Sequence, residues 1–230
     1  MGIYILNRDG DILWQHDDPK VSHDADMLSS GNILYVYGMG DAKGDTIVKE
    51  ITMSGTRVWH WDPSQYFDYS PYSEIDPVSG QGWAHANSVT RLDNGNTLIS
   101  IRNFNMIVEV NPAGTPVDTI FDVESPHDPL VLPNNYLLAA HQTSTVHSAY
   151  KYNRSSAQVE WQYDMTDKND FPMRDVNLLP NGNILITGAK RLVELVPSTN
   201  EVVWQLELTG TIQQGEGPSK GFYKAERIVN

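Results

Sequence analysis

The sequence predicts an all-β protein built from repeated units, and three observations support this prediction. Four segments share one order of features: a polar residue, an apolar run, a turn rich in Asn, Gly, Ser or Pro, and a second apolar run; they begin at His23, Asn87, His127 and Arg174. A third run and then a strand ending near a large aromatic residue follow each segment, and no stretch has helical periodicity. Four-stranded units repeating at about 40–50 residues predict a β-propeller.

The strands of each unit follow in the order a, b, c and d, from the central axis outward. Turns such as Asp93-Asn94-Gly95-Asn96 have the chemistry of tight antiparallel connections between strands a and b. The fourth strand carries the aromatic residue that we expect to pack between neighbouring blades; these residues are Trp14, Trp59, Phe121, Trp161 and Trp204.

The two ends of the chain are expected to share one closing blade. The first residues, GIYILNRDGDILW, match a c–d pair, whereas GFYKAERIVN near the end matches a strand a. A blade made from both ends removes two exposed sheet edges and gives five blades, the last without strand b. We therefore expect a single domain over residues 1–230, the alternative being that the chain is a piece of a longer parent.

Composition excludes several classes of function. The formal net charge of −13 argues against nucleic-acid binding, which needs a basic face. The absence of cysteine excludes disulfides, thiolate metal sites and cysteine nucleophiles. No apolar run approaches the roughly 18 residues that span a bilayer, and the first residues lack the features of a secretory signal. The compartment and the oligomeric state are left open.

Polar residues recur at one phase of the repeat and are expected to surround the axis at one face. Strand a lines the axis, so its first residues form a ring made of His23, Asn87, His127, Arg174 and Tyr223. His85 precedes Asn87, and strand b returns Arg102 and His141 to the same face. We expect these side chains to converge, with the long connections 63–84, 164–173 and 208–221 covering the mouth.

Three chemistries fit such a ring. A histidine could attack an electrophilic sulfur or phosphorus, with arginine and asparagine holding the anionic oxygens. His23, His127 and His141 could bind a transition metal, although two nearby arginines disfavour a cation, and we expect neither a metal nor another cofactor. The mouth could also bind an anion, an aryl compound or a glycan without catalysing a reaction.

The most specific motif resembles a known family. His85-x-Asn87, a turn and Ser100-x-Arg102, within WAHANS…SIRN, are similar to the nucleotide-independent arylsulfate sulfotransferases. The later Pro-His-Asp-Pro at residues 126–129 and FYKAERI at residues 222–228 are similar as well. Members of that family are six-bladed propellers with an additional N-terminal domain, and they move a sulfuryl group between phenols through a sulfated histidine.

The resemblance implies roles for the residues that match the family's motifs. It places the nucleophile at His127 and the contact with the sulfuryl oxygens at Arg102, with His85 and Asn87 beside it, and it places a contact with the donor or phenol at His23. His141 and Arg174 have no clear counterpart in the family pattern. From their place in the ring, we expect Asn87, His141, Arg174 and Tyr223 to bind the substrate. The resemblance also implies an aryl sulfate and a phenol as partners, and a periplasmic or extracellular location. The alternative is a propeller that binds such ligands without catalysis.

Overall fold

The computed structural model describes residues 2–38, 40–78, 80–142, 147–165, 173–208 and 221–228. Its contacts divide the chain into two compact units, Met1–Asp122 and Val123–Asn230. Most of the connections 164–173 and 208–221, which we expected to cover the mouth, lies outside the described residues. The single domain over residues 1–230 stays a prediction.

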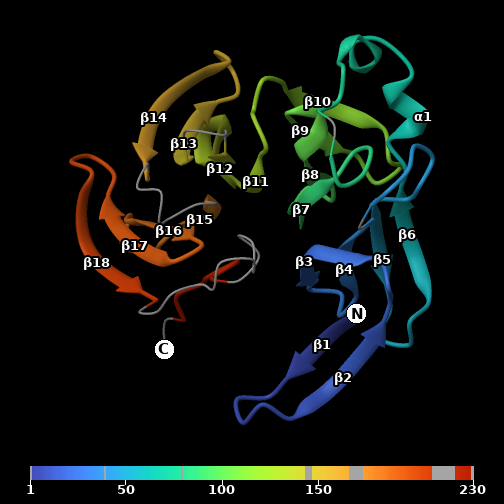
Figure 1. The fold of residues 1–230 in the computed structure, drawn as a ribbon, viewed down its shortest axis with the longest axis horizontal. Helices are drawn as coiled ribbons and strands as arrows, with labels where there is room; N and C mark the ends of the chain where they lie inside the picture. The colour runs from blue at the N-terminus through green and yellow to red at the C-terminus, as the bar shows by residue number, and fades with distance from the viewer. Residues whose placement is uncertain are drawn as a thin grey trace. The chain divides into compact units, whose positions relative to one another are not determined.

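The first unit contains two four-stranded antiparallel sheets and a separate hairpin (Figure 1). Blade 1 consists of β3 (Val21–Met27), β4 (Ile33–Tyr37), β5 (Val48–Ile51) and β6 (Arg57–Trp61). Blade 2 consists of β7 (Ala86–Arg91), β8 (Thr97–Ile101), β9 (Met106–Val110) and β10 (Pro116–Ile120). The hairpin is formed by β1 (Gly2–Leu6) and β2 (Ile12–Asp17).

The second unit contains two further sheets of the same design. Blade 3 consists of β11 (His127–Leu132), β12 (Tyr136–Gln142), β13 (His147–Asn153) and β14 (Gln158–Asp164). Blade 4 consists of β15 (Met173–Leu178), β16 (Ile184–Gly188), β17 (Arg191–Val196) and β18 (Glu201–Glu207). Strands pair in chain order in all four blades, so the predicted a–b–c–d units are confirmed.

The turn between the first two strands has one geometry in three blades. Leu28, Leu92 and Leu179 each donate their N–H to the asparagine that follows the turn glycine, at 2.8 Å. Gly95 has a φ of 85°, a left-handed conformation that glycine adopts without steric cost. The asparagine amide then reaches a glutamate on the third strand, as Asn96 does to Glu109 at 2.6 Å. The Gly-Asn pair therefore fixes both the turn and the register.

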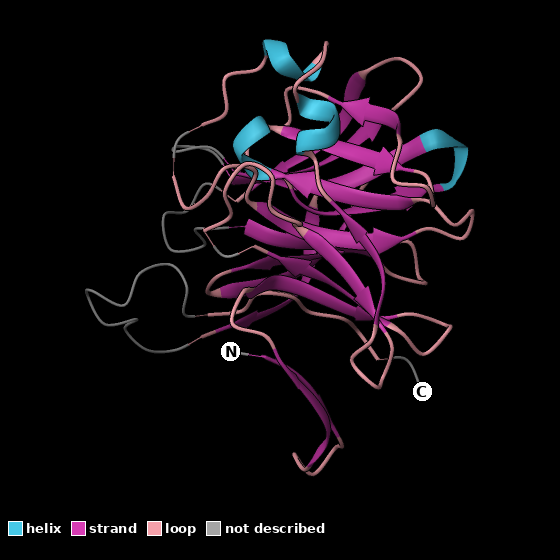
Figure 2. Ribbon diagram, turned by 90° about the vertical axis from the view of Figure 1, so that its right-hand side faces the viewer, coloured by secondary structure: helices cyan, strands magenta, loops and turns pink. Residues whose placement is uncertain are grey.

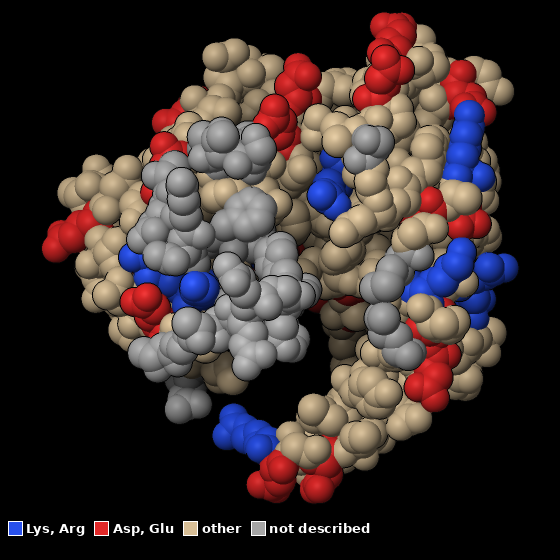
Figure 3. Space-filling view, viewed as in Figure 1, with Lys and Arg blue, Asp and Glu red and all other residues tan. Residues whose placement is uncertain are grey.

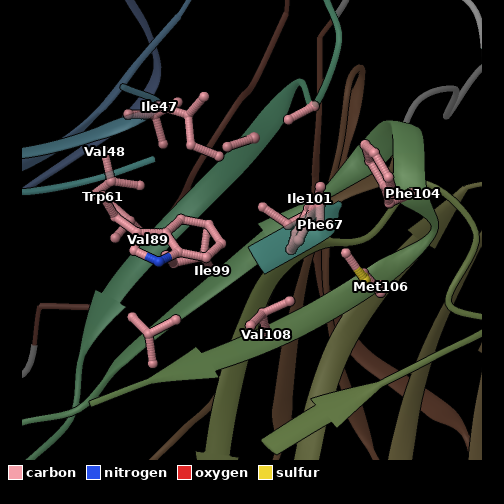
Figure 4. Close-up of a cluster of buried hydrophobic side chains, with 14 of the residues drawn as sticks. Ile47, Val48, Trp61, Phe67, Val89, Ile99, Ile101, Phe104, Met106 and Val108 are labelled. Carbon is pink, nitrogen blue, oxygen red and sulfur yellow. The ribbon is translucent and has the colours of Figure 1, made fainter. Parts of the chain in front are cut away.

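A continuous apolar core holds blades 1 and 2 together. Figure 4 shows Trp61 and Phe67 among side chains from β5, β7, β8 and β9. Trp61 is 2% exposed and donates its indole N–H to the carbonyl of Gly114 at 2.9 Å. All five residues of β8 and all five of β9 are buried, so both faces of these inner strands are covered. Blades 3 and 4 have a separate core, in which β16 is likewise buried throughout.

Within each unit, tryptophans of the outermost strands link a sheet to the next one along the chain. The indole N–H of Trp14 donates to Met53 O at 2.8 Å, and that of Trp59 donates to Pro112 O at 3.0 Å. Trp161 does the same to Asn200 Oδ1 at 2.9 Å. Phe121 differs: it follows β10 and lies against Tyr72, with ring centroids 6.1 Å apart.

The two ends of the chain match the prediction in part. In the first unit, β1 and β2 form a two-stranded sheet that packs against blade 1 through Ile3, Ile5 and Trp14, and the turn of this hairpin projects beyond the blade (Figures 1 and 2). In the second unit, the described residues 221–228 contain no strand, although Ala225 N donates to Asp175 Oδ2 at 3.0 Å. In the same way, the N–H of Val89 in β7 donates to Asp24 Oδ2 on blade 1 at 3.0 Å. Four blades are therefore present, and a fifth closing blade stays a prediction.

The connection 63–84 is more ordered than its composition indicated. It contains α1 (Ser64–Phe67) and the 3₁₀ turn η1 (Tyr72–Glu74), and it has its own aromatic core. The Phe67 ring lies 4.9 Å from Tyr72 and 4.8 Å from Phe104, between centroids. Two further 3₁₀ turns, η2 (Arg102–Phe104) and η3 (Pro133–Asn135), follow β8 and β11.

No helix among the described residues has the length and apolar character needed to cross a bilayer. On the side drawn in Figure 3, lysine and arginine form separate patches interspersed with aspartate and glutamate rather than one continuous basic area. The predicted absence of nucleic acid and membrane among the partners stays a prediction.

Candidate functional site

The candidate site of the first unit is built around His85, which directly precedes β7. Its backbone has a φ of 50°, and its N–H and that of Ala84 both donate to the buried carboxylate of Asp41, at 3.2 and 2.7 Å. Trp83 N donates to the carbonyl oxygen of the same aspartate at 2.7 Å. Asp41, in the loop after β4, therefore holds the chain that carries His85.

The tautomer of His85 follows from its neighbours. Nδ1 lies 2.9 Å from the carbonyl oxygen of Gln81, which can only accept, so Nδ1 carries the proton. Burial lowers the pKa of His85, and the Arg102 charge adds to this, against the opposing effects of the Gln81 carbonyl and Asp41. His85 is therefore neutral at pH 7, with the lone pair on Nε2.

His23 and Arg102 both approach that lone pair. His23 Nε2 lies 3.0 Å from His85 Nε2 and so acts as the donor, with the ring centroids 4.8 Å apart. Arg102 Nη1 lies 3.4 Å from the same nitrogen and 3.4 Å from Gln81 Oε1. The structure thus brings together three residues that the sequence predicted to converge.

The register of β3 explains why His23 can reach across. Pairing with β4 shifts between Val21 and Ala25, and His23 has a φ of 52° in this irregular stretch. His23 is solvent-exposed, whereas Asn87 in β7 is 2% exposed. The two residues have the same position in the repeat but different environments, because the irregularity turns His23 toward His85.

A cavity of about 400 Å³ opens beside this cluster. Its walls include Ser22, His23, Gly38, Gln81 and His85. Gly82, next to the cavity, has a φ of 124°, and a Cβ there would clash with the Asp41 carboxylate, so this position requires glycine. Two imidazoles line this cavity, and Arg102 contacts two of the lining residues, His85 and Gln81. Such a cavity can hold a small anion attached to an organic group.

Two residues of this site were not predicted from the sequence. Asp41 anchors His85. Asn103 holds the loop that leads to His85, because its Nδ2 donates to Gly80 O at 3.1 Å and to Gly82 O at 2.8 Å. Asn103 belongs to the SIRN motif, so its position was visible in the sequence. Asp41 lies in the glycine-rich stretch GMGDAKGD, which marks an unusual backbone but does not identify its partner.

The second unit places His127 at the start of β11. Its Nδ1 lies 2.9 Å from the carbonyl oxygen of Ser125, so Nδ1 carries a proton. The side chain is 7% exposed. Next to it, Asp128 pairs with Lys224 at 3.0 Å, which ties residues 221–228 to blade 3 as well as to blade 4.

Arg174 and Tyr223 lie together in the second unit, as the repeat phase predicted. The Arg174 guanidinium carbon is 4.7 Å from the centroid of the Tyr223 ring, and Nη1 donates to Phe222 O at 3.4 Å. Burial lowers the pKa of Arg174, opposed by Tyr223. These contacts give Arg174 a structural role in holding residues 221–228, and its role in substrate binding stays a prediction.

His141 lies one residue beyond the pairing of His127 with Ala140, in a more apolar setting than expected. Its ring meets Tyr150 edge-on at 5.3 Å, and burial lowers the pKa of His141. His147, which the sequence did not single out, is 5% exposed, and burial followed by the His141 charge lowers its pKa. Among the described residues, no group of three His, Asp or Glu side chains is arranged as a metal site.

Comparisons with known proteins agree with this description. Residues 14–121 match the model of the family described as Arylsulfotransferase (ASST). This range contains His23, His85, Asn87 and Arg102, whereas His127 lies beyond it. No curated protein matches the sequence significantly.

Solved structures show the fold. A protein of unknown function from Bacteroides caccae is 19% identical, with a TM-score of 0.64 over 90% of this chain and 74% of its own. Virginiamycin B lyase from Staphylococcus aureus is 11% identical, with a TM-score of 0.54 over 91% of this chain and 64% of its own. The Dos1 propeller is 10% identical, with a TM-score of 0.53 over 92% of this chain and 54% of its own.

The chain spans less than two thirds of the lyase and of the Dos1 propeller. At these identities the likeness shows the fold alone, and it confirms the predicted β-propeller class. The family match covers slightly less than half of the chain, but it contains the whole WAHANS…SIRN motif that suggested the resemblance. The match over residues 14–121 therefore supports the predicted resemblance to the arylsulfotransferase family.

Proposed function

We propose that the protein transfers a sulfuryl group from an aryl sulfate to a phenol through a sulfated His127. The observation that carries the proposal is the neutral His85 beside Arg102, within the segment that matches the family. His127 Nδ1 faces the Ser125 carbonyl oxygen, which leaves Nε2 as the ring nitrogen for the proposed attack on sulfur.

The transfer has two balanced steps. His127 Nε2 attacks sulfur, an N–S bond forms, the S–O bond to the aryl group breaks, and the phenolate leaves with the bonding electron pair. A second phenol then gives its proton to His23, which lost its own to the first phenolate, and its oxygen attacks sulfur. An O–S bond forms, and the N–S bond breaks to regenerate the imidazole. Each step is a displacement at sulfur, so it needs no redox partner.

The other residues have distinct roles in this proposal. Arg102 holds the sulfuryl oxygens with charge-assisted hydrogen bonds that strengthen as negative charge shifts toward the leaving oxygen. Asn87 adds a neutral contact. His23 contacts the donor or the phenol, and its proton, shared with His85, can move to the departing phenolate.

The proposal predicts turnover of 4-nitrophenyl sulfate with phenol as acceptor, measured by nitrophenol release. His127→Asn is expected to abolish turnover, whereas His60→Asn, at an exposed position on β6, is expected to retain it. Mass spectrometry of the protein mixed with donor alone is expected to show one added sulfuryl group on a peptide containing His127. Equal turnover by the His127→Asn variant contradicts the proposal.

A second candidate is a binding module that holds an aryl sulfate or another organic anion without catalysis. The specific observation in its favour is that His127 lies outside the matched residues, whereas the residues beside the cavity lie within them. Calorimetric titration with 4-nitrophenyl sulfate separates the two candidates. Binding that Arg102→Gln weakens, with no nitrophenol release and no added mass on histidine, supports the module.

A further inference from the structure

The contact between blades 1 and 2 contains a triad of side chains near the a–b turns. Arg91 of β7 stacks on Trp59 of β6, with 5.2 Å between the guanidinium carbon and the ring centroid. The same arginine donates to Glu50 of β5 at 2.8 Å. Glu50 and Trp59 are direct partners in the β5–β6 register. The arginine therefore occupies the space between the two blades and completes both contacts.

The same triad recurs where residues 221–228 meet blade 4. Arg227 lies 5.2 Å from Trp204, and its Nη1 lies 2.7 Å from Glu194 Oε2. Glu194 and Trp204 are partners in the β17–β18 register. Two contacts within this one chain thus show what normally fills this place: a cation stacked on tryptophan and paired with a glutamate.

The contact between blades 3 and 4 keeps the tryptophan but replaces the other two residues. Trp161 of β14 is the register partner of Lys151 on β13, so a lysine stands where the other contacts have glutamate. Leu178 of β15 stands four residues after Arg174, as Arg91 stands four after Asn87. At the contact between blades 3 and 4, a lysine therefore replaces the glutamate, and a leucine replaces the stacking arginine.

A groove is present at this altered contact. It has a volume of about 460 Å³, and its lining includes Leu132, Tyr136, Leu138, Lys151, Trp161 and Leu178. The Lys151 ammonium lies 3.7 Å from the centroid of the Tyr136 ring and forms no ion pair with any described residue. The groove therefore combines aromatic and aliphatic walls with one positive charge.

The nearby Glu160 does not take the place of the missing partner. Its carboxylate accepts hydrogen bonds from Asn153 Nδ2 at 2.7 Å and from Tyr136 Oη at 2.8 Å. Those two bonds, and then the Lys151 charge, lower the pKa of Glu160, so the carboxylate influences the lysine from a distance. Its oxygens are already committed to other donors.

We propose that this groove is a second ligand site, for a planar aromatic compound that carries one negative charge. The ring would lie along Trp161 and the leucines, and the anionic group would pair with Lys151. At the other two contacts, a positively charged arginine pairs with a glutamate. Because a lysine stands in place of that glutamate here, the matching ligand carries a negative charge. Since β11 runs from His127 to Leu132, the groove lies about 16 Å from His127 at ~3.3 Å per residue. The proposal is independent of the proposed function.

The test uses 2-naphthoate as probe and its uncharged shape analogue 2-acetylnaphthalene, with tryptophan fluorescence and NMR line broadening as readouts. Lys151→Met is expected to weaken 2-naphthoate binding about fivefold, because a partly exposed ion pair contributes modestly. The same change is expected to leave 2-acetylnaphthalene binding unaltered. Lys190→Met, which removes the same single positive charge elsewhere in the second unit, is the matched control and is expected to have no effect.

A second variant fills the groove by restoring the triad. Lys151→Glu combined with Leu178→Arg is expected to abolish the binding of both probes while keeping the circular dichroism spectrum and the urea midpoint. If that variant does not fold, the Lys151→Met comparison still decides. Absence of 2-naphthoate binding to the wild-type protein, unchanged binding by Lys151→Met, or full binding by a folded double variant would each overturn the proposal.

Discussion

Replacing Asp41 with alanine tests whether this carboxylate positions His85. The carboxylate is 3% exposed and accepts two main-chain N–H groups, from Ala84 at 2.7 Å and His85 at 3.2 Å. The substitution removes both acceptors but leaves the two donors in place. A buried donor without a partner costs about 1–3 kcal/mol.

We expect the loss in the free energy of unfolding to lie toward the lower end of the summed cost of two unpaired N–H donors. His85 and Gln81 line the neighbouring cavity, so water entering there can partly satisfy the exposed N–H groups. We therefore expect a loss of about 2–3 kcal/mol in the free energy of unfolding. With a urea dependence of about 1–3 kcal/mol per molar, the midpoint of the first unit falls by about 1 M.

Urea unfolding and amide hydrogen exchange measure the two consequences. The amides of Ala84 and His85 are expected to lose protection in Asp41→Ala, and 4-nitrophenyl sulfate is expected to bind more weakly because His85 is no longer held. Asp45→Ala removes a half-buried carboxylate of the same loop that accepts hydrogen bonds from Lys20 and Ala42 rather than from Ala84 and His85, and it is the matched control. Unchanged protection at both amides in Asp41→Ala would refute the positioning role.

Three further predictions concern the described contacts. Trp59→Phe keeps the aromatic packing but loses the bond to Pro112 O, and we expect a loss of about 1 kcal/mol by urea unfolding. Burial lowers the pKa of His85 from its ordinary 6.5, so the unfolded chain takes up a proton at a higher pH than the folded protein does. Stability is therefore expected to fall as the pH drops below 6.5. In His85→Gln, the urea midpoint is expected to depend less on pH between about 7.5 and 5. Arg227→Ala removes the contacts with Trp204 and Glu194, and residues 221–228 are expected to exchange amide protons and to be cut by protease faster, with Arg8→Ala as the control.

The repeat made the blades predictable from the sequence. Gly-Asn turns, paired apolar runs and outer tryptophans are local signals that recur, so each blade supports the assignment of the others. The same phase placed His127 and Arg174 at the starts of β11 and β15. It did not reveal the irregular pairing of β3, which turns His23 toward His85, because a shift of register leaves no clear signal in composition.

The residues that the sequence did not reveal act through the main chain. Asp41 and Asn103 bind backbone groups of a loop far along the chain or across a strand end, and any polar residue at those places would look alike in the sequence. The order within the connection 63–84 was missed for a related reason. Its aromatic residues form a small core only once Phe104 of blade 2 is beside them.

The tryptophan links described above run in one direction along the chain. The donor is always on the earlier sheet and the acceptor on a turn of the later one, from Trp14 to Met53, from Trp59 to Pro112, and from Trp161 to Asn200. An indole has a single donor, whereas a turn oxygen has two lone pairs and can turn to water. When a later sheet opens, the tryptophan of the earlier sheet loses its hydrogen-bond acceptor, whereas opening of the earlier sheet costs the later one less. Within each unit, local unfolding is therefore expected to propagate toward the N-terminus.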